Sequence, residues 1–456
     1  FGIRGRMGYN PIKVSQAYYC EDPFLNQLGV NPVFNLLTST LDDNRKENRT
    51  LHLMSEEDAL SKVQKYLHRQ GIDRLSPIAR KVEREGTPNR RNVVLVFMES
   101  MSANLMGTFG SDKKLTPYLD SLYQQSLSFS HFYFSGIHTN HGIYSTLYSF
   151  PAIMKRNAMK GSVIPVYSGL PTVLQENGYC NLFFMTHESQ YDNMNAFLRT
   201  NGFDEIYAQE NYPSEKVVNS FGVQDDFMYQ YALPILNERA GTGNPFFSVL
   251  LSISNHPPYV IPPYFHPHSD VLEEQIVEYA DWSIRQFMQA AEKQPWFDNT
   301  IFVFLGDHGK MVGTPECEMP QSYNHIPLMI YGKDIKPGVY DGFGGQVDVS
   351  PTLLGLLNIS YLQNNFGVNL LEEERPCMFF TADNLIGARD SVNMFIYSPD
   401  SQQEFKYKLE EGKLHAATGT DEEAFRNLKD YCFSMLQSTE SLVKEHKTLD
   451  KVSVKK

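Results

Sequence analysis

The most informative stretch of this chain is an apolar run that ends abruptly in a small polar turn, Asn299-Thr300-Ile301-Phe302-Val303-Phe304-Leu305-Gly306-Asp307-His308-Gly309. Its β-branched and aromatic residues predict a buried strand. On a continuing strand, Asp307 and His308 would point to opposite faces. They can serve one centre only if the strand stops, and the flanking glycines permit that bend. A carboxylate beside an imidazole suits zinc or manganese. Taken alone, the pair is equally compatible with a tight turn in which Asp307 caps the backbone and His308 is solvated.

Composition indicates an ordinary globular protein. The chain has 456 residues, of which 41% are hydrophobic and 20% charged, so it can bury a large core, and its length predicts two or three domains. Its 40 basic and 53 acidic residues give a formal net charge of -13, which argues against nucleic acid as the main partner. An anionic substrate would then need local positive charge, for example from a metal ion. The five cysteines show no CxxC spacing, so neither a zinc ribbon nor a dense disulfide framework is indicated.

The chain begins at Phe1 without a signal-like segment, and its longest apolar runs have the length of strands. We therefore expect it to be the soluble portion of a longer polypeptide, with any membrane anchor upstream.

The residue pattern predicts three parts. Residues 1–88 have apolar residues at helical spacing and predict a helical arm or linker, with a Ser-x-x-Asp cap at Ser55. Residues 89–389 alternate strands and helices, which is typical of a mostly parallel sheet flanked by helices, an α/β fold. Residues 390–456 predict a small α+β subdomain. The strands expected in the middle part are 92–98, 181–186, 246–254, 300–305 and 327–331, and the helices are 117–126, 171–177, 224–239, 272–294 and 349–357.

Polar residues of metal-binding or catalytic types follow four of these strands. Glu99 follows strand 92–98, His187 follows 181–186, His256 lies at the end of 246–254, and Asp307 and His308 follow 300–305. Ligands of open α/β sheets bind outside the carboxyl ends of the strands. The sequence therefore predicts one shared site, although each residue alone would more often be structural.

The predicted site can hold a metal and a nucleophile. Glu99, Asp307 and His308 provide three ligands and leave an open position, which is the catalytic arrangement. Thr139, in a glycine-bounded turn, is the candidate for that position, because a divalent cation favours the alkoxide of a threonine and neutralises a phosphoryl oxygen. The alternative is that Thr139 only caps a helix at 143–148.

Several motifs together carry a family resemblance. They are Val93 to Ser100, Leu115-Thr116-Pro117-Tyr118-Leu119-Asp120, Thr139-Asn140-His141-Gly142, Ser254-Asn255-His256-Pro257-Pro258-Tyr259, Leu305-Gly306-Asp307-His308-Gly309, and Gln346 to Leu354. In this order they resemble the sulfatase-like part of the alkaline phosphatase superfamily, and within it the lipoteichoic acid synthase and phosphoglycerol transferase group. The resemblance covers about residues 90–390.

The resemblance implies an alkaline phosphatase-like fold and a metal-dependent transferase. Glu99, Asp307 and His308 match the metal ligands of the family, and Thr139 matches its metal-bound nucleophile, which takes phosphoglycerol from phosphatidylglycerol and passes it to an envelope glycan or lipid acceptor. His187 and His256 resemble positions that contact phosphoglycerol. The implied metal is manganese, with magnesium or zinc as alternatives. Family members are membrane-anchored, and their catalytic domains lie on the extracytoplasmic face of the bacterial cytoplasmic membrane.

The chain departs from the family around the substrate. His141 and Tyr144 stand where relatives have Arg and Glu, and the Trp and Arg that follow His187 in the synthases are replaced by a segment that contains Asp192 and Asn193. These two side chains could bind a polyol head group or cap a helix. A sulfatase or phosphodiesterase-type hydrolase, a phosphoethanolamine transferase and a catalytically silent domain that binds head groups or glycans remain alternatives. Sulfatase chemistry needs a Cys or Ser where this chain has Thr139.

Overall fold

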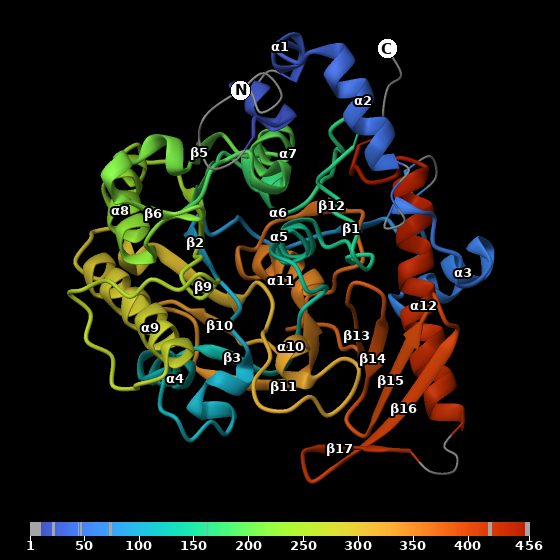
Figure 1. Cartoon of the computed structure of the whole chain (residues 1–456). Coiled ribbons are helices and arrows are strands. Elements are labelled where there is room, and N and C mark those ends of the chain that lie inside the picture. Colours follow the sequence, from blue (N-terminus) through green and yellow to red (C-terminus); the bar gives the residue numbers. More distant parts are fainter. Residues whose placement is uncertain are drawn as a thin grey trace.

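The structure is a computed structural model that describes residues 11–20, 23–43, 45, 48–72, 75–161, 163–417 and 422–451. At its centre lies an eight-stranded sheet with the strand order β11-β3-β10-β9-β2-β8-β4-β5 (Figure 1). Only β10 runs against its neighbours, so the sheet is mostly parallel, as predicted. The strands are β2 (Asn92–Met98), β3 (Leu127–Tyr133), β4 (Cys180–Met185), β5 (Glu205–Tyr207), β8 (Phe246–Leu251), β9 (Thr300–Gly306), β10 (Leu328–Tyr331) and β11 (Gly338–Gly345).

Helices cover both faces of this sheet (Figure 1). Alternate residues of β2 supply the two cores: Val94 and Val96 pack on one side, and Val93 and Leu95 on the other. Because both faces are buried, the central strands are continuous apolar runs. The first side is covered by α4 (Pro117–Gln125), α8 (Asp225–Ala240) and α9 (Leu272–Ala291), and the second by α5 (Thr139–Tyr148), α6 (Leu170–Glu176), α7 (Met194–Thr200) and α11 (Val349–Leu356).

The predicted strands all occur, with ends shifted by at most three residues. The sequence analysis missed β3, β5 and β11. In β3, the residues Ser128, Ser130 and His131 interrupt the apolar pattern, and β11 contains four glycines. These strands are held by pairing with neighbours rather than by a sequence pattern of their own.

A five-stranded antiparallel sheet near the carboxyl end packs against a long helix, α12 (Glu422–Lys444). Its strands are β13 (Met378–Thr381), β14 (Ile386–Arg389), β15 (Asn393–Ser398), β16 (Gln403–Glu410) and β17 (Lys413–Ala416). The sheet therefore includes two strands that precede residue 390, where the sequence analysis placed the start of the small subdomain. The hairpin turn between β13 and β14 gave too little signal to place this start.

The amino-terminal arm, defined here as residues 11–82 as described, contains α1 (Pro23–Leu28), α2 (Pro32–Asp43), α3 (Glu56–Tyr66) and β1 (Arg80–Val82). The predicted cap is present, because Ser55 accepts a hydrogen bond from the backbone N–H of Asp58. The arm's strand β1 pairs with β12 (Tyr361–Gln363). Residues 1–10 of the predicted arm lie outside the described residues. The remaining short elements are β6 (Val217–Asn219), β7 (Gly222–Val223) and α10 (Gln321–Asn324).

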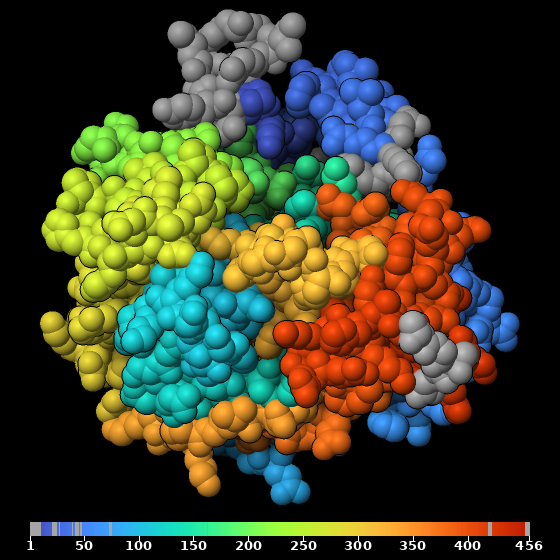
Figure 2. Space-filling model, turned by 60° about the horizontal axis from the view of Figure 1, so that its bottom comes forward, coloured from blue at the N-terminus to red at the C-terminus, as the bar shows by residue number. Residues whose placement is uncertain are grey.

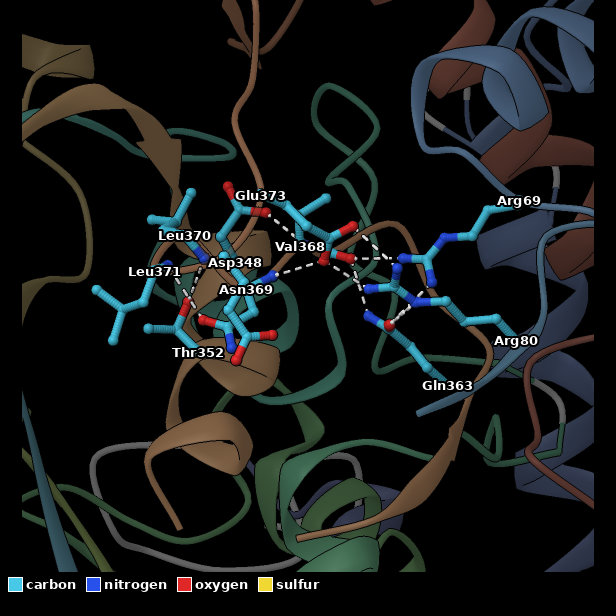
Figure 3. A network of polar contacts seen from close by, with 12 residues as sticks. Arg69, Arg80, Asp348, Thr352, Gln363, Val368, Asn369, Leu370, Leu371 and Glu373 are labelled. Atoms are coloured by element: carbon cyan, nitrogen blue, oxygen red, sulfur yellow. Dashed lines mark hydrogen bonds and ion pairs between the residues drawn. The ribbon is translucent and has the colours of Figure 1, made fainter. Parts of the chain in front are cut away.

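A polar network fastens the arm to the segment that follows α11 (Figure 3). Arg69 and Arg80 both donate to Gln363 Oε1, at 2.9 Å each, and Arg80 also pairs with the Glu373 carboxylate. The backbone N–H of Val368 donates to Asp348, at the start of α11. The arm is therefore joined to a loop that also contacts the start of α11.

Asp348 also forms a fully buried ion pair with Arg375. The guanidinium meets the carboxylate through Nε and Nη2, at 2.9 and 2.6 Å, and its Nη1 donates to the Tyr431 hydroxyl of α12. The two side chains are at most 1% exposed. This pair therefore connects α11, the loop before β13 and α12.

We expect Arg375→Met to lower the free energy of unfolding by about 3–5 kcal/mol, because it leaves the Asp348 carboxylate buried without a counter-charge. Lys333→Met is the matched control: it breaks the exposed Lys333–Asp298 pair and should change stability little. Urea unfolding measures both variants. Equal losses in the two would contradict the importance of the buried pair.

Candidate metal centre and active site

Two carboxylates leave neighbouring strands at the same level of the sheet. In the parallel pair β2–β9, Met98 lies opposite Gly306, so Glu99 and Asp307 are the next residues on adjacent strands. Both are buried, with 1% and 0% of their surfaces exposed. Glu99 Oε1 accepts a hydrogen bond from the Ser100 hydroxyl at 2.8 Å. The two acids therefore lie side by side at the carboxyl edge.

The strand ends at Gly306, directly before Asp307, as the sequence predicts. Asp307 Oδ1 accepts the backbone N–H groups of Ser100 and His308, at 2.8 and 2.7 Å, and the Asp307 N–H donates to Met98 O. Asp307 therefore does cap a backbone turn, as the alternative interpretation has it, but it uses only Oδ1 to do so. Oδ2 is buried and has no hydrogen-bond partner, so this oxygen remains available to a ligand.

His308 faces both carboxylates. Its Nδ1 donates to Gly309 O at 2.8 Å, so in the neutral ring Nε2 carries the lone pair. Nε2 lies 3.5 Å from Asp307 Oδ2 and 3.8 Å from Glu99 Oε1. Ligand atoms from the three residues all lie within 4.8 Å of one another. The solvated histidine of the alternative interpretation is not observed, since the side chain is only 14% exposed.

These residues fit a divalent cation. Burial, and then the neighbouring Asp307 carboxylate, raise the pKa of Glu99 well above its ordinary value. A lone pair on His308 and an unpartnered carboxylate oxygen converge on the same point. Carboxylate oxygens and an imidazole nitrogen around a common point are ligands that suit zinc, manganese or a similar ion. A cation there would satisfy all three groups at once.

Thr139 lies at this centre. It is the first residue of α5, and its hydroxyl donates to Glu99 Oε2 at 3.4 Å. The cap position of the helix is occupied by His138, without a side-chain cap bond, so Thr139 is not the cap. Gly142 explains how the helix comes so close: a Cβ there would lie 2.4 Å from Asp307 O. A larger residue would push α5 away from Asp307.

The other predicted residues lie at different places around the centre. His187 is buried, its Nδ1 donates to Glu188 O, and its Nε2 has no partner. Burial lowers the pKa of His187 to about 4. Asp192 accepts from Asn140, the neighbour of Thr139, at 2.9 Å. These contacts bring His187 and Asp192 to the side of the centre where α5 begins.

Two predicted substrate residues have other contacts. The Asn193 amide donates to Met159 O at 2.7 Å, and its side chain lines a pocket beside the arm. It occupies the cap position of α7 without a side-chain cap bond, and its contact with a head group stays a prediction. His256 packs against the Phe221 ring, with ring centres 4.2 Å apart, and donates to Pro257 O.

The sequence analysis missed two residues at the centre. Lys310 donates to Asn255 Oδ1 at 2.6 Å and is close enough for the charge of Glu99 to influence it, while burial lowers its pKa to about 8. Tyr191 packs on His187, with ring centres 4.7 Å apart. Burial raises the pKa of Tyr191, and the charges of Glu99 and Asp307 contribute to this rise. Lys310 could have been recognised, since it follows the Asp-His-Gly turn directly.

Comparison with known proteins gives the family. Residues 91–359 match the sulfatase family model. A lipoteichoic acid synthase-like protein of Bacillus subtilis is 25% identical over 362 residues, which cover 72% of this chain and 56% of that protein. A lipoteichoic acid synthase of Staphylococcus aureus is 24% identical over 400 residues, with 77% and 58% covered. The chain thus spans little more than half the length of these relatives. No helix within the described residues has both the length and the apolar character needed to cross a membrane.

Solved structures share the fold. An alkaline phosphatase superfamily protein of Vibrio parahaemolyticus superposes with a TM-score of 0.78 at 24% identity, covering 88% of this chain and 99% of that one. A lipoteichoic acid synthase of Listeria monocytogenes gives a TM-score of 0.69 at 21% identity, with 84% and 98% covered. The chain therefore belongs to the sulfatase family.

Proposed function

We propose that the chain is a metal-dependent transferase that moves a phosphoglycerol group from a phospholipid to an envelope glycan or lipid acceptor. The observation that carries the proposal is the Thr139 hydroxyl, which lies 3.4 Å from Glu99 in the buried Glu-Asp-His centre. The proposed place of action is the extracytoplasmic face of the bacterial cytoplasmic membrane. The chain would reach that membrane through an upstream anchor.

In the first displacement, Thr139 Oγ attacks the phosphorus of a phosphatidylglycerol-like donor. The bond from phosphorus to the diacylglycerol oxygen breaks, and phosphoglycerol stays on Thr139. The hydrogen bond to Glu99 Oε2 orients the threonine oxygen before the attack. A divalent cation, with manganese preferred and magnesium or zinc as alternatives, would be held by Glu99, Thr139, Asp307 and His308 and would supply positive charge for the threonine oxygen and the phosphoryl oxygens.

In the second displacement, an acceptor hydroxyl attacks the same phosphorus and the bond to Thr139 breaks, which restores its hydroxyl. Two transfers through one covalent intermediate allow donor and acceptor to use the same edge of the sheet in turn. Water as the acceptor would make the protein a phosphodiesterase, so the acceptor decides between transfer and hydrolysis.

Neutral His187 supports a hydroxyl-bearing substrate. Because its Nδ1 donates to a carbonyl, the buried and unpartnered Nε2 is a hydrogen-bond acceptor. A glycerol hydroxyl supplies the missing donor. Lys310 provides positive charge for a phosphoryl oxygen, and Asp192 and His256 are further proposed contacts to the head group.

Membership of the sulfatase family does not imply that this chain hydrolyses sulfate esters. Formylglycine formation requires Cys or Ser, and residue 139 is Thr. A catalytically silent domain would have no reason to keep an unpartnered Asp307 oxygen and the His308 lone pair aimed at one point. Binding of a cation therefore separates the enzyme from the silent alternative.

We expect a divalent cation to stabilise the protein by about 2.7 kcal/mol when its free concentration is about 100 times Kd. Manganese, magnesium and zinc are added separately to metal-free protein, and thermal unfolding is followed. Glu99→Gln should lose this stabilisation because it removes a ligand charge. If Glu99→Gln and the wild type respond equally, the cation binds elsewhere.

Thr139→Ala should lower diacylglycerol release from phosphatidylglycerol by at least about 1,000-fold, because it removes the nucleophile. Thr139→Ser keeps a hydroxyl and should retain part of the activity. Head-group label should appear on residue 139 of the wild type, as measured by peptide mass spectrometry. A fully active Thr139→Ala variant would refute the covalent mechanism.

We expect Gly142→Ala to lower kcat by about 10–100-fold without unfolding the protein, because the new methyl group displaces α5 and with it Thr139. Gly338→Ala is the control, since a Cβ there meets nothing within 4 Å. Circular dichroism checks the fold of both variants. Equal activity of the two would show that the close approach of α5 is not needed.

A further inference from the structure

A pocket of about 610 Å³ lies between the arm and the sheet domain. Its apolar walls come from distant parts of the chain: Phe34 and Leu41 from α2, Ile153 and Ile164 from the segment after α5, and Val443 from α12. Tyr144, on the same helix as Thr139, also lines it. The pocket thus has aliphatic walls among polar and charged residues and lies next to the helix that carries the proposed nucleophile.

Positive charge gathers at one part of this pocket. Lys13 and Lys160 both line it and repel each other, and burial together with Lys160 lowers the pKa of Lys13. Lys13 Nζ also lies 5.9 Å from the centre of the Tyr191 ring, at the edge of the candidate active site. Arg45 and Arg156 also line the pocket, and Arg156 is paired with Glu440. Two ammonium groups near each other beside aliphatic walls fit an anionic amphiphile.

The arm is held against the segment that follows His187. The backbone N–H of Lys13 donates to Gln190 Oε1 at 2.9 Å, and the Asn195 amide donates to the carbonyls of Ser15 and Tyr18. Both Gln190 and Asn193 line the pocket. A molecule in the pocket therefore contacts the loop that also positions His187 and Asp192.

The outer face of the arm is apolar and exposed. In α2, the residues Val33, Leu36 and Leu37 follow helical spacing on the side away from the pocket and are 60–66% exposed, and Leu28 of α1 is 67% exposed. Figure 1 shows α1 and α2 at one end of the molecule, outside the helices that cover the sheet, and Figure 2 shows α2 projecting at the rim. Single exposed leucines are common, but a contiguous aliphatic patch of this kind marks an interaction surface.

We propose that the outer face of α1 and α2 docks on a bilayer that contains anionic phospholipid, and that the pocket beneath admits one such lipid from it. The phosphate lies at Lys13 and Lys160, and an acyl chain lies along Phe34, Leu41 and Ile153. Protein interfaces are enriched in aromatic residues, Met and Arg, whereas this face is formed by Leu and Val. The chain as a whole carries a charge of -13 and is repelled by an anionic surface, so the two lysines supply local attraction.

That the captured lipid serves as the donor rests on the proposed function, but the membrane docking does not. Two readouts keep these apart. Co-sedimentation with vesicles of phosphatidylglycerol and phosphatidylcholine, or of phosphatidylcholine alone, measures docking. Turnover of the water-soluble p-nitrophenyl ester of glycerol phosphate measures the chemistry without a membrane.

We expect the wild type to bind the anionic vesicles more tightly than the neutral ones, with binding weakened by high salt. The double variant Leu36→Glu, Leu37→Glu should lose at least about tenfold in vesicle affinity, because two carboxylates would enter the apolar layer. Its turnover of the soluble ester should stay near that of the wild type. Lys13→Ala with Lys160→Ala should reduce the preference for anionic vesicles. Val339→Glu with Val392→Glu, at exposed aliphatic sites outside the arm, is the matched control and should bind vesicles as the wild type does.

Vesicle binding by the Leu36/Leu37 variant equal to that of the wild type would overturn the inference. A wild-type dimer that this variant abolishes, seen by light scattering, would also overturn it, since the face would then join two copies of the chain. If the wild type binds vesicles but does not turn over the soluble ester, docking stands and the proposed function fails. If it turns over the ester but does not bind vesicles, the proposed function stands and the docking fails.

Discussion

The proximity of two buried carboxylates is the constraint on which this structure depends. Glu99 and Asp307 follow adjacent strands at one level of the sheet, where the low dielectric makes their mutual repulsion strong. Backbone N–H groups and a serine hydroxyl compensate only part of that charge. The negative charge that is left uncompensated faces the same point as the His308 lone pair. A positive charge is therefore favoured at that point. The rest of the site is arranged around this point.

Much of the fold and part of the site could be predicted from the sequence. The buried parallel strands were recognisable because both of their faces are apolar, and Glu99, Asp307 and His308 were recognisable because they follow such strands. Strand β3 was not, since Ser128 and Ser130 interrupt its pattern and its place depends on pairing with β10 and β11. The start of the small antiparallel sheet was missed because the turn between β13 and β14 gave too little signal.

The surroundings of the centre were harder to predict because they depend on contacts between distant segments. His141, which stands at the position of an arginine in relatives, is buried, and its Nε2 bonds to Arg156 O. Burial, and then His138, lower its pKa to about 3, so it is neutral and structural in this chain. The positive charges around the candidate centre are instead Lys310 and, beside Tyr191, Lys13 of the arm, which lie 171 and 126 residues from Thr139 in the sequence. Lys310 could be recognised because it follows the Asp-His-Gly turn, but no local pattern indicates that Lys13 lies near this centre.

The reversed direction of β10 has a consequence for how such proteins diversify. Strand β9 returns directly into β10 without a crossover helix, so the intervening segment, residues 307–327, stays at the edge where the metal ligands lie. Both ends of this segment are anchored in the central sheet, while residues 313–316 are exposed. Insertions or exchanges in this segment can reshape the approach to the metal centre without disturbing the strand order. Changes there can therefore alter what reaches the candidate centre while Glu99, Asp307 and His308 stay in place.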